Sequence, residues 1–398
     1  MIRHLLKLVW HRKRANAFVM AEIFFSFLVI FAVLTAATAI GMRWNEPLGF
    51  AWHDVWVIRF DTEGNGPEPH DDDSAFRPTL IKLLNEVRSF PDVVDASVRM
   101  TPPFGNSTSS GTWVIDGKRI DLTRDEVSDS YANTMRMPVI RGRWFRPDDD
   151  AATFKPVVLD ADLAKARYGD HDPIGKLFDR DGTTVYRVVG VVPPYRKNGE
   201  LSPAGVNMVF NRVSMFGKER APRNILVRVR PGTAAQVEEE MTKRLHAVEP
   251  TASFGIQRME AMRASSLRAR LSPLIILGIV ALFLISMVAL GLTGVLWQNV
   301  SRRTRELGVR RALGATGADV RRQVLIEVAL LSTLAVIVGV VIVLQLPILG
   351  IFSLVSPPIF TFGLIASLVL IYAITLLCAA YPSWLASVIE PAEALRYE

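Results

Sequence analysis

The nearest approach to catalytic chemistry in this chain is a glycine- and lysine-containing string at residues 169–177, GDHDPIGKL. A phosphate-binding loop has the pattern G-x-x-x-x-G-K-[ST] after a strand, so that its backbone amides can cradle phosphates. The string has one residue too many, and Leu177 stands where a hydroxyl side chain is needed. We therefore expect no ATP binding by this route.

Acidic side chains are the other candidates for chemistry. His70 precedes Asp71, Asp72 and Asp73, a set that could bind a metal ion, and a second acidic run occupies 148–150. No second cluster of ligand residues accompanies the first run, so we interpret both runs as solvated acidic loops. The chain also has neither G-x-S-x-G nor H-E-x-x-H. It therefore predicts no enzyme, and no metal or cofactor site in this polypeptide.

A basic segment between two apolar runs has a more informative pattern. Read as a helix, Arg302 and Glu306, and then Glu306 and Arg310, are i,i+4 ion pairs. Gly314 can close that helix in a left-handed cap, where a side chain would clash. The segment therefore predicts a short basic helix that ends at a glycine.

A second helix is predicted to start directly afterwards. Thr316 and Asp319 have the spacing of a capping box, in which each side chain accepts a hydrogen bond from the backbone amide of the other residue. The helix would begin at about Gly317. Two helices joined by a tight elbow are therefore expected from local chemistry alone.

Half of the 398 residues are apolar, which is a high share for a chain in which 21% are charged. The excess lies in four windows, at 18–42, 272–297, 324–346 and 359–381. Each has about the 20 residues that a helix needs to cross a hydrocarbon core of roughly 30 Å. We predict four transmembrane helices. The single cysteine, Cys378, lies in the fourth window and allows no internal disulfide.

Lysine and arginine set the orientation of these helices, because positive charge near the ends of spans is retained in the cytoplasm. Basic residues precede the first span and recur between the second and third: Arg3, Lys7, Arg12, Lys13, Arg14, Arg302, Arg303, Arg305, Arg310, Arg311, Arg321 and Arg322. The turn at 347–358 is uncharged and suits the outer side. We therefore expect both termini, 1–17 and 382–398, and the segment 298–323 in the cytoplasm.

The region 43–271 is then a single large domain outside the membrane. It contains 33 basic and 32 acidic residues, a balance of +1, so the net charge of +7 arises mainly in the cytoplasmic segments. Nucleic-acid binding would require a basic patch on a folded domain. We expect no nucleic-acid partner.

The N-terminal segment 1–17 has an apolar and a basic side when written as a helix, with Leu5 and Leu6 opposite Arg3 and Lys7. That pattern is typical of an amphipathic helix in the membrane interface, in contact with lipids, although a plain basic flank fits equally. A signal peptide is the alternative for this end. The apolar run is longer than the roughly 7–15 residues of a signal core, so we expect an uncleaved anchor.

Two acidic residues, Glu22 and Glu327, lie within the first and third spans. An acid inside a membrane is by default a functional group, such as a proton relay. Both residues are close to the cytoplasmic ends of their spans and within reach of local arginines. We therefore favour structural pairing over a relay.

The outer domain has two β-α-β patterns, at about 43–102 and about 206–257. Each combines strands of alternating apolar residues with a helix that has one apolar face. Two such units predict a ferredoxin-like layered subdomain. Between them, at about 103–205, short strands and the Asp116-Gly117 hairpin signal predict an inserted β-rich subdomain.

A helical stalk at 258–271 is expected to continue into the second span, with a kink or boundary at Pro273. The predicted fold class is therefore an α+β membrane protein. It has four transmembrane helices and a large extracytoplasmic domain between the first two.

Four stretches resemble one family. RTRELGVRRALGATGADVRRQVLIE is similar to the signature that follows the second span of MacB/FtsX-type ABC transporter permeases. VIRGRWFRPDDD, DPIGKLF with VYRVVGVVPPY, and the terminal EPAEALRYE resemble periplasmic and C-terminal patterns of the MacB branch. The resemblance covers nearly the whole chain, in the order that the topology predicts.

The resemblance implies a coupling helix around Arg305 that docks into a groove on an ABC ATPase, which binds ATP and Mg. MacB itself carries its ATPase ahead of the first span, and only a few residues precede that span here, so we expect a separate ATPase chain. The residues expected to contact this partner or to form the elbow are Arg302, Arg305, Glu306, Leu307, Val309, Arg310, Arg311, Leu313, Gly314 and Gly317.

The implied function is that of a non-catalytic permease subunit in the bacterial inner membrane. It would couple ATP hydrolysis to movement of periplasmic domains (mechanotransmission), for export or extraction of a periplasmic or outer-leaflet substrate. Four spans are too few to enclose a large substrate route, so a second permease chain is expected, in a homo- or heterodimer. A periplasmic adaptor or outer-membrane component is a further candidate partner.

The alternative is an FtsX-like regulatory scaffold that controls a periplasmic partner such as a cell-wall hydrolase. The size of the outer domain favours the transporter, because the FtsX branch usually has a smaller one. A membrane-tethered sensor is disfavoured, because no signalling domain is recognised on the cytoplasmic side.

Overall fold

A computed structural model describes residues 13–62, 76–105, 109–115, 118–181, 183–201, 207–214, 221–302, 316–349 and 357–388. The described chain forms two compact units. The membrane unit contains the residues up to Met42 and those from Leu271 onward, and the interspan domain is Arg43–Arg270. Each unit is considered by itself below.

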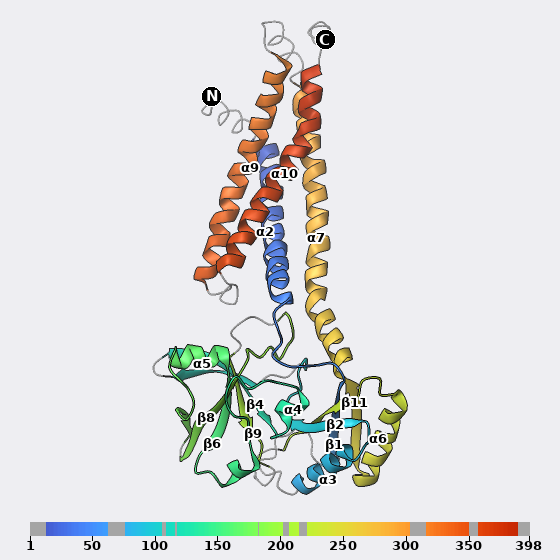
Figure 1. Cartoon of the computed structure of the whole chain (residues 1–398). Coiled ribbons are helices and arrows are strands. Elements are labelled where there is room, and N and C mark those ends of the chain that lie inside the picture. The colour runs from blue at the N-terminus through green and yellow to red at the C-terminus, as the bar shows by residue number, and fades with distance from the viewer. Residues whose placement is uncertain are drawn as a thin grey trace. The chain divides into compact units, whose positions relative to one another are not determined.

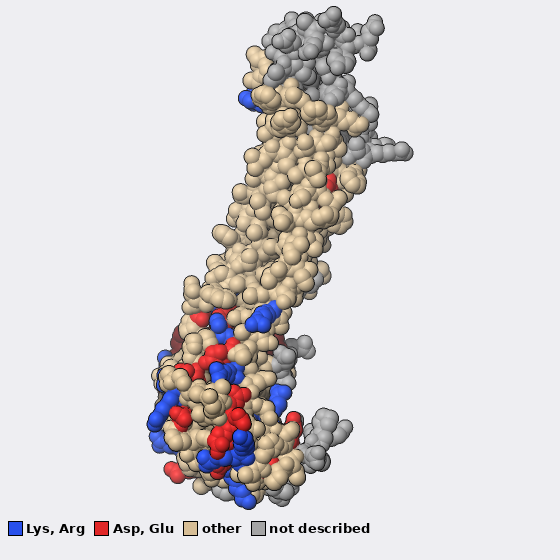
Figure 2. All heavy atoms as spheres, turned by 90° about the vertical axis from the view of Figure 1, so that its right-hand side faces the viewer, with Lys and Arg blue, Asp and Glu red and all other residues tan. Residues whose placement is uncertain are grey.

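Four long helices form the membrane unit, and each is long and apolar enough to cross a membrane. They are α2 (Lys13–Trp44), α7 (Met259–Arg302), α9 (Gly317–Ile348) and α10 (Pro357–Val388). Each predicted span lies within one of these helices, which confirms the four-helix prediction. Figure 2 shows charged side chains gathered on the interspan domain and very few along the helices.

One expected boundary in these helices is wrong, because α10 continues through Pro382 to Val388. The segment 382–398, expected as a tail, therefore begins inside a helix. The expected stalk does continue into the second span as one helix, α7, with Pro273 in its interior. A proline removes one amide donor and costs about 3 kcal/mol in a helix interior, which the packing of a long helix can offset. A hydropathy window shows which part of a helix is apolar. It does not show where the backbone hydrogen bonds of the helix end.

Small residues bring the membrane helices close together. A side-chain carbon added at Gly339 of α9 would meet the ring of Phe27 on α2. One added at Gly363 of α10 would meet Thr35, also on α2. Helices in lipid gain little from the hydrophobic effect and associate through such close packing. These glycines therefore allow α9 and α10 to pack against α2.

The interspan domain contains the two predicted β-α-β units (Figure 1). The first is β1 (Val55–Thr62), α3 (Arg77–Arg88) and β2 (Val93–Arg99), and the second is β10 (Asn224–Val229), α6 (Ala235–Val248) and β11 (Ala252–Arg258). The strands pair antiparallel in the order β11-β1-β10-β2. The two units therefore interleave in one sheet, as the predicted ferredoxin-like subdomain requires.

The helices α3 and α6 pack on this sheet because each has an apolar side at helical spacing. Leu80, Leu83 and Val87 of α3 are buried with Met241 and Leu245 of α6 in one core. Burying one such leucine contributes about 2 kcal/mol. We call this cluster of apolar side chains the ferredoxin-like core.

The inserted subdomain continues the same sheet. Its elements are β3 (Ser109–Ile115), β4 (Lys118–Val127), α4 (Tyr131–Thr134), β5 (Arg141–Gly142), the 3-10 helix η1 (Pro147–Ala151), β6 (Lys155–Asp160), α5 (Ala161–Tyr168), β7 (Leu177–Asp181), β8 (Thr184–Val192) and β9 (Asn207–Arg212). The strand order is β4-β9-β6-β8-β5, with β3 paired to β4 and β7 paired to β8. The β3–β4 pairing closes at Ile115 opposite Lys118, as the Asp-Gly hairpin signal predicts.

The boundary expected at about residue 206 is wrong. Strand β9 lies in the inserted subdomain, where it pairs with β4 and β6, and the ferredoxin-like subdomain resumes only with β10. The sequence of β9, NMVFNR, identifies a strand, but alternation along a strand does not specify its neighbours. The insertion therefore extends past Arg212.

The two subdomains meet where β2 runs beside β4. A single residue pair, Arg99 opposite Val127, joins these strands. We call this place the joint. Side chains of both subdomains also pack together beside this pair, in one apolar cluster that includes Val57, Leu226 and Phe210.

Candidate functional site

Two of the ten residues expected in the coupling segment lie within the described chain. Arg302 is the last residue of α7, and Gly317 is the first residue of α9. The other eight lie outside the described residues: Arg305, Glu306, Leu307, Val309, Arg310, Arg311, Leu313 and Gly314. Contact between these residues and an ATPase stays a prediction.

The start of α9 has the predicted capping box. The amide of Asp319 donates to Thr316 Oγ1 at 3.3 Å, and the amide of Thr316 donates to Asp319 Oδ2 at 3.0 Å. The helix begins at Gly317, which confirms the start predicted from the spacing. These bonds satisfy amides that the first turn of a helix leaves unpaired, and they hold the helix start at one position.

Glu22 lies against α7 within the membrane unit. A side-chain carbon at Gly291 would come within 2.7 Å of Glu22 Oε2. This oxygen is buried and accepts no hydrogen bond from any residue that the structure describes. Lys7 and Arg12, two of the nearby basic residues in the sequence, lie outside the described chain. The pairing expected for Glu22 is therefore not made by Oε2 within the described residues.

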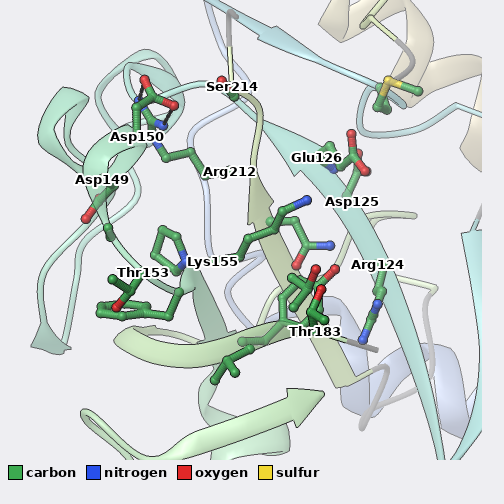
Figure 3. A pocket seen from close by; sticks show the side chains of 18 of the residues that line it. Arg124, Asp125, Glu126, Asp149, Asp150, Thr153, Lys155, Thr183, Arg212 and Ser214 are labelled. Atoms are coloured by element: carbon green, nitrogen blue, oxygen red, sulfur yellow. Dashed lines mark hydrogen bonds and ion pairs between the residues drawn. The ribbon is translucent and has the colours of Figure 1, made fainter. Parts of the chain in front are cut away.

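The inserted subdomain contains a polar pocket of about 950 Å³ (Figure 3). Its lining comes from β4, β6, β8, β9 and the turn that contains η1. Charged and hydroxyl side chains line it: Thr101, Arg124, Asp125, Glu126, Asp149, Asp150, Thr153, Lys155, Thr183, Thr184, Arg212 and Ser214. Among the described residues, no group of three or more His, Cys, Asp or Glu side chains is placed to hold a metal ion. The lining suits recognition of a polar group.

Ion pairs fix the basic side chains of the pocket. Arg212 is paired with Asp150 at 2.5 Å and with Asp129 at 2.7 Å, and Figure 3 shows its side chain turned toward Asp150. Arg124 is paired with Asp179 at 2.8 Å. These arginines connect β4 and β9 to neighbouring turns and strands, so they hold the shape of the wall.

The acidic run at 148–150 is not simply a solvated loop, and that interpretation is wrong for two of its residues. Asp149 is buried and paired with Arg143 at 2.6 Å, and Asp150 is paired with Arg212. Burial alone would raise the pKa of Asp149, but hydrogen bonds from Arg143 and the Arg146 amide lower it below its usual value. The 3-10 turn places Asp149 beside an arginine that is near in sequence and Asp150 beside one that is distant. The acidic run alone does not indicate either partner.

A cluster of buried polar residues lies at the joint and is called the joint cluster. The guanidinium of Arg99 on β2 donates to Asp125 Oδ2 on β4 at 2.7 and 2.9 Å. Lys197 donates to the same oxygen at 3.2 Å. Arg99 also donates to the hydroxyl oxygens of Tyr131 and Tyr195, which are 2.8 Å apart. The cluster therefore crosses the joint with two cations and one anion.

Burial sets the charge behaviour of this cluster. The side chains of Arg99, Asp125 and Lys197 are 0%, 1% and 2% exposed. Desolvation lowers the pKa of Lys197 to about 8, although the charge of Asp125 opposes the change. Desolvation raises the pKa of Tyr131 and of Tyr195. Lys197 is therefore close to its titration point at mildly basic pH.

Sequence reasoning did not identify these residues. Arg99 ends a strand with the apolar residues Val93, Ala96 and Val98, and this is the signal that could have found it, because an unpaired buried cation is too costly to persist. Arg228 of β10 repeats the pattern in a strand whose residues are all buried. It donates to the carbonyl oxygens of Ala51, His53 and Thr134 at 2.7, 2.9 and 2.5 Å.

Two family models match the chain. A model of the MacB-like periplasmic core domain matches residues 25–244, and one of the FtsX-like permease C-terminal region matches residues 278–391. Because the first match alone covers more than half of the chain, the protein belongs to the MacB/FtsX-like family of ABC transporter permeases.

Individual relatives are distant. The chain is 26% identical over 299 residues to the "Macrolide export ATP-binding/permease protein MacB" of Bordetella avium, in a match that covers 70% of this chain and 45% of that protein. It is 25% identical over 288 residues to the "Uncharacterized ABC transporter permease YknZ" of Bacillus subtilis, with 70% of each chain covered. The match thus spans less than half the length of the Bordetella relative.

Among solved structures, the periplasmic region of MacB from Actinobacillus actinomycetemcomitans is similar to 56% of this chain, over 97% of its own length. The identity is 18% and the TM-score is 0.38.

Proposed function

We propose that this chain is the non-catalytic permease subunit of an ABC transporter in the bacterial inner membrane, with both termini in the cytoplasm and the interspan domain in the periplasm. The distribution of charge supports this orientation. The interspan region has nearly equal numbers of acids and bases, whereas the N-terminal segment and the segment between α7 and α9 are strongly basic. Export or extraction of a periplasmic or outer-leaflet substrate is the proposed task.

The proposed energy source is an ABC ATPase on a separate chain, which binds ATP and Mg. Its docking point is the segment 298–323, because that segment is cytoplasmic in this orientation and has the sequence pattern of the family's coupling helix. The capped start of α9 at Gly317 supports this assignment, because it holds one arm of the elbow in place. A second permease chain completes the substrate route, and a periplasmic adaptor or outer-membrane component is a candidate partner.

One observation carries the proposal that force is transmitted by a helix. The helix α7 is unbroken over 44 residues, from Met259 in the interspan domain to Arg302 at the start of the coupling segment. At 1.5 Å per residue it is about 66 Å long. A hydrogen-bonded helix resists compression along its axis, so a displacement at Arg302 is delivered to Met259. ATP-driven movement of the ATPase would thereby reposition the interspan domain.

The test is the ATPase activity of the complex reconstituted with its ATPase and second permease chain. Glu306→Lys reverses a charge on the coupling helix, and Gly314→Leu blocks the glycine cap, so each is expected to reduce substrate-responsive turnover by about tenfold or more, equivalent to about 1.4 kcal/mol of coupling. Glu239→Lys, on the exposed side of α6, is the matched control and should leave turnover unchanged. Normal, substrate-responsive turnover in both coupling variants would contradict the proposal.

A further inference from the structure

A loop at 195–200 connects the joint cluster to both ends of the interspan domain, and we call it the link loop. Two of its side chains enter the joint cluster, where Lys197 donates to Asp125 and Tyr195 accepts from Arg99. The side chains of two other loop residues contact the ends of the domain. Arg196 contacts the N-terminal end and Glu200 contacts the C-terminal end. The six residues of the loop therefore contact the joint and both ends of the interspan domain.

At the N-terminal end, Arg196 holds the last turn of α2 and the segment that follows it. Its Nη1 donates to the carbonyl oxygen of Arg43 at 2.9 Å, and its guanidinium forms an ion pair with Glu46. Its own amide donates to the carbonyl oxygen of Leu48 at 3.0 Å. The Arg196 side chain is 6% exposed and that of Glu46 is 50% exposed, so only the arginine of this pair is buried.

At the C-terminal end, Glu200 holds the first turns of α7. Its Oε1 accepts from Arg263 Nε at 2.8 Å and from Nη2 at 2.5 Å. The guanidinium of Arg263 also lies over the ring of Trp52, 4.4 Å from its centre. Since α7 begins at Met259, this pair connects the start of that helix to the link loop.

The backbone of the link loop is itself bonded at several points. Gly199 has a left-handed backbone, with φ at +86°, and its amide donates to the carbonyl oxygen of Arg196 at 3.0 Å. The carbonyl oxygen of Lys197 accepts from the Phe104 amide at 2.9 Å. A side chain at position 199 would be strained in that conformation and would meet the Phe104 ring. A loop fixed in this way passes on a displacement instead of absorbing it.

We propose that the link loop is the element through which α7 sets the geometry of the joint, with Arg263 and Glu200 as its positioning residues. The inference rests on the proposed function, in which α7 moves. A shift of α7 would carry the loop with it and move Lys197 against Asp125. Because Asp125 belongs both to the joint cluster and to the pocket lining, the same shift changes the wall of the pocket.

The test is hydrogen–deuterium exchange of the full-length chain in lipid nanodiscs, compared between the wild type and Arg263→Ala. The readout is the rate of hydrogen exchange at two backbone amides. The Arg196 amide donates to Leu48, and the Phe104 amide donates to Lys197 in the link loop. Loss of the anchor should let the loop open locally, so exchange at these amides should become on the order of tenfold faster. Glu200→Gln removes the same pair without shortening the side chain and should give the same change.

The matched control is Arg244→Ala. Arg244 is paired with Glu86 at 2.5 Å and lies 4.3 Å from the centre of the Phe90 ring, so it has the same two kinds of contact as Arg263. Its loss should accelerate exchange near α3 and α6 and leave the Arg196 and Phe104 amides within about twofold of wild type. Equal exchange at those two amides in the Arg263 and Arg244 variants would overturn the proposal.

This readout is separate from the proposed function, because it requires no ATPase. In the reconstituted complex, Arg263→Ala should also abolish substrate stimulation while basal ATP hydrolysis persists. Stimulation equal to that of Arg244→Ala would contradict the role of the link loop. A wild-type complex without coupled ATP hydrolysis would instead contradict the proposed function, and the exchange result would still report whether Arg263 holds the loop.

Discussion

Two parts of the interspan domain are built in different ways. The ferredoxin-like core between α3, α6 and its sheet is a cluster of apolar side chains that includes Leu83. At the joint, Arg99, Asp125 and Lys197 are buried with tyrosines and phenylalanines. Apolar packing is non-directional and tolerates small shifts, whereas a buried ion pair is stable only in one geometry. The ferredoxin-like core therefore provides stability, and the joint cluster specifies how the two subdomains fit.

Removing the single anion of the joint cluster should have the largest effect. Asp125→Asn leaves Arg99 and Lys197 buried together without a counter-charge, which is expected to cost about 3–5 kcal/mol of unfolding free energy. The measurement is chemical unfolding of the full-length chain in detergent, followed by tryptophan fluorescence. A loss below about 1 kcal/mol would mean that the cluster is not electrostatically coupled as described.

A cavity in the ferredoxin-like core should cost somewhat less and should not depend on pH. Leu83 is fully buried, so Leu83→Ala is expected to lose about 3 kcal/mol. The same unfolding experiment, repeated at pH 7 and pH 9, should give equal losses because Leu83 packs among apolar side chains. A loss that changes with pH would remove the contrast between the two parts of the domain.

Raising the pH should stabilise the joint through Lys197. Its pKa is about 8 in the folded protein and near 10.5 when exposed, so between these values the unfolded chain binds more protons and stability rises with pH. Across pH 8 to 10 the gain is about 2 kcal/mol. The Lys197 ammonium faces Asp125 and the charge of Arg99, and Arg99 in turn donates to Tyr131 and Tyr195. Burial keeps both tyrosines protonated above their usual range, which opposes the gain only above about pH 10.

Lys197→Met provides the control for this pH dependence. It retains the Arg99–Asp125 pair and removes the titrating group, so the rise between pH 8 and 10 should disappear. A slope that persists in this variant would assign the titration to another residue. The measurement is the midpoint of chemical unfolding as a function of pH.

A partly exposed ion pair should show the smallest effect. Arg124 and Asp179 are 2.8 Å apart, nearly the distance between Arg99 and Asp125, but their side chains are 20% and 26% exposed. Asp179→Asn is expected to change the unfolding free energy by less than about 1 kcal/mol. The N–O distances of the two pairs are nearly equal and their burial differs, so comparison with Asp125→Asn tests the effect of burial on the unfolding free energy. Equal losses of unfolding free energy in the two variants would contradict an effect of burial.

The parts of the fold that follow from local pattern were predictable from the sequence. Four apolar runs specified four helices, and the spacing of Thr316 and Asp319 specified where α9 begins. Two β-α-β patterns specified the ferredoxin-like subdomain. In each case the determining interactions are close in sequence or repeat with the period of the element, so one chain segment contains the necessary information.

The parts that depend on distant partners were not predictable. The pairing of β9 with β4 and β6 joins segments far apart in the chain, and its own residues are compatible with other neighbours. Asp125 and Lys197 are separated by 72 residues, and neither has a local feature that indicates burial. The arginine at the end of β2 was the available signal, and it indicates only that a partner exists.

The central claim is that this chain is driven by an ABC ATPase docked at the segment 298–323. The most direct test is purification of the full-length chain from its native membranes in mild detergent, with partners identified by mass spectrometry, for the wild type and Glu306→Lys. We expect an ABC ATPase to co-purify in stoichiometric amount with the wild type and to be depleted with the variant. If the same amount of ATPase co-purifies with both proteins, or if none co-purifies with the wild type, an ABC ATPase does not dock at this segment as proposed.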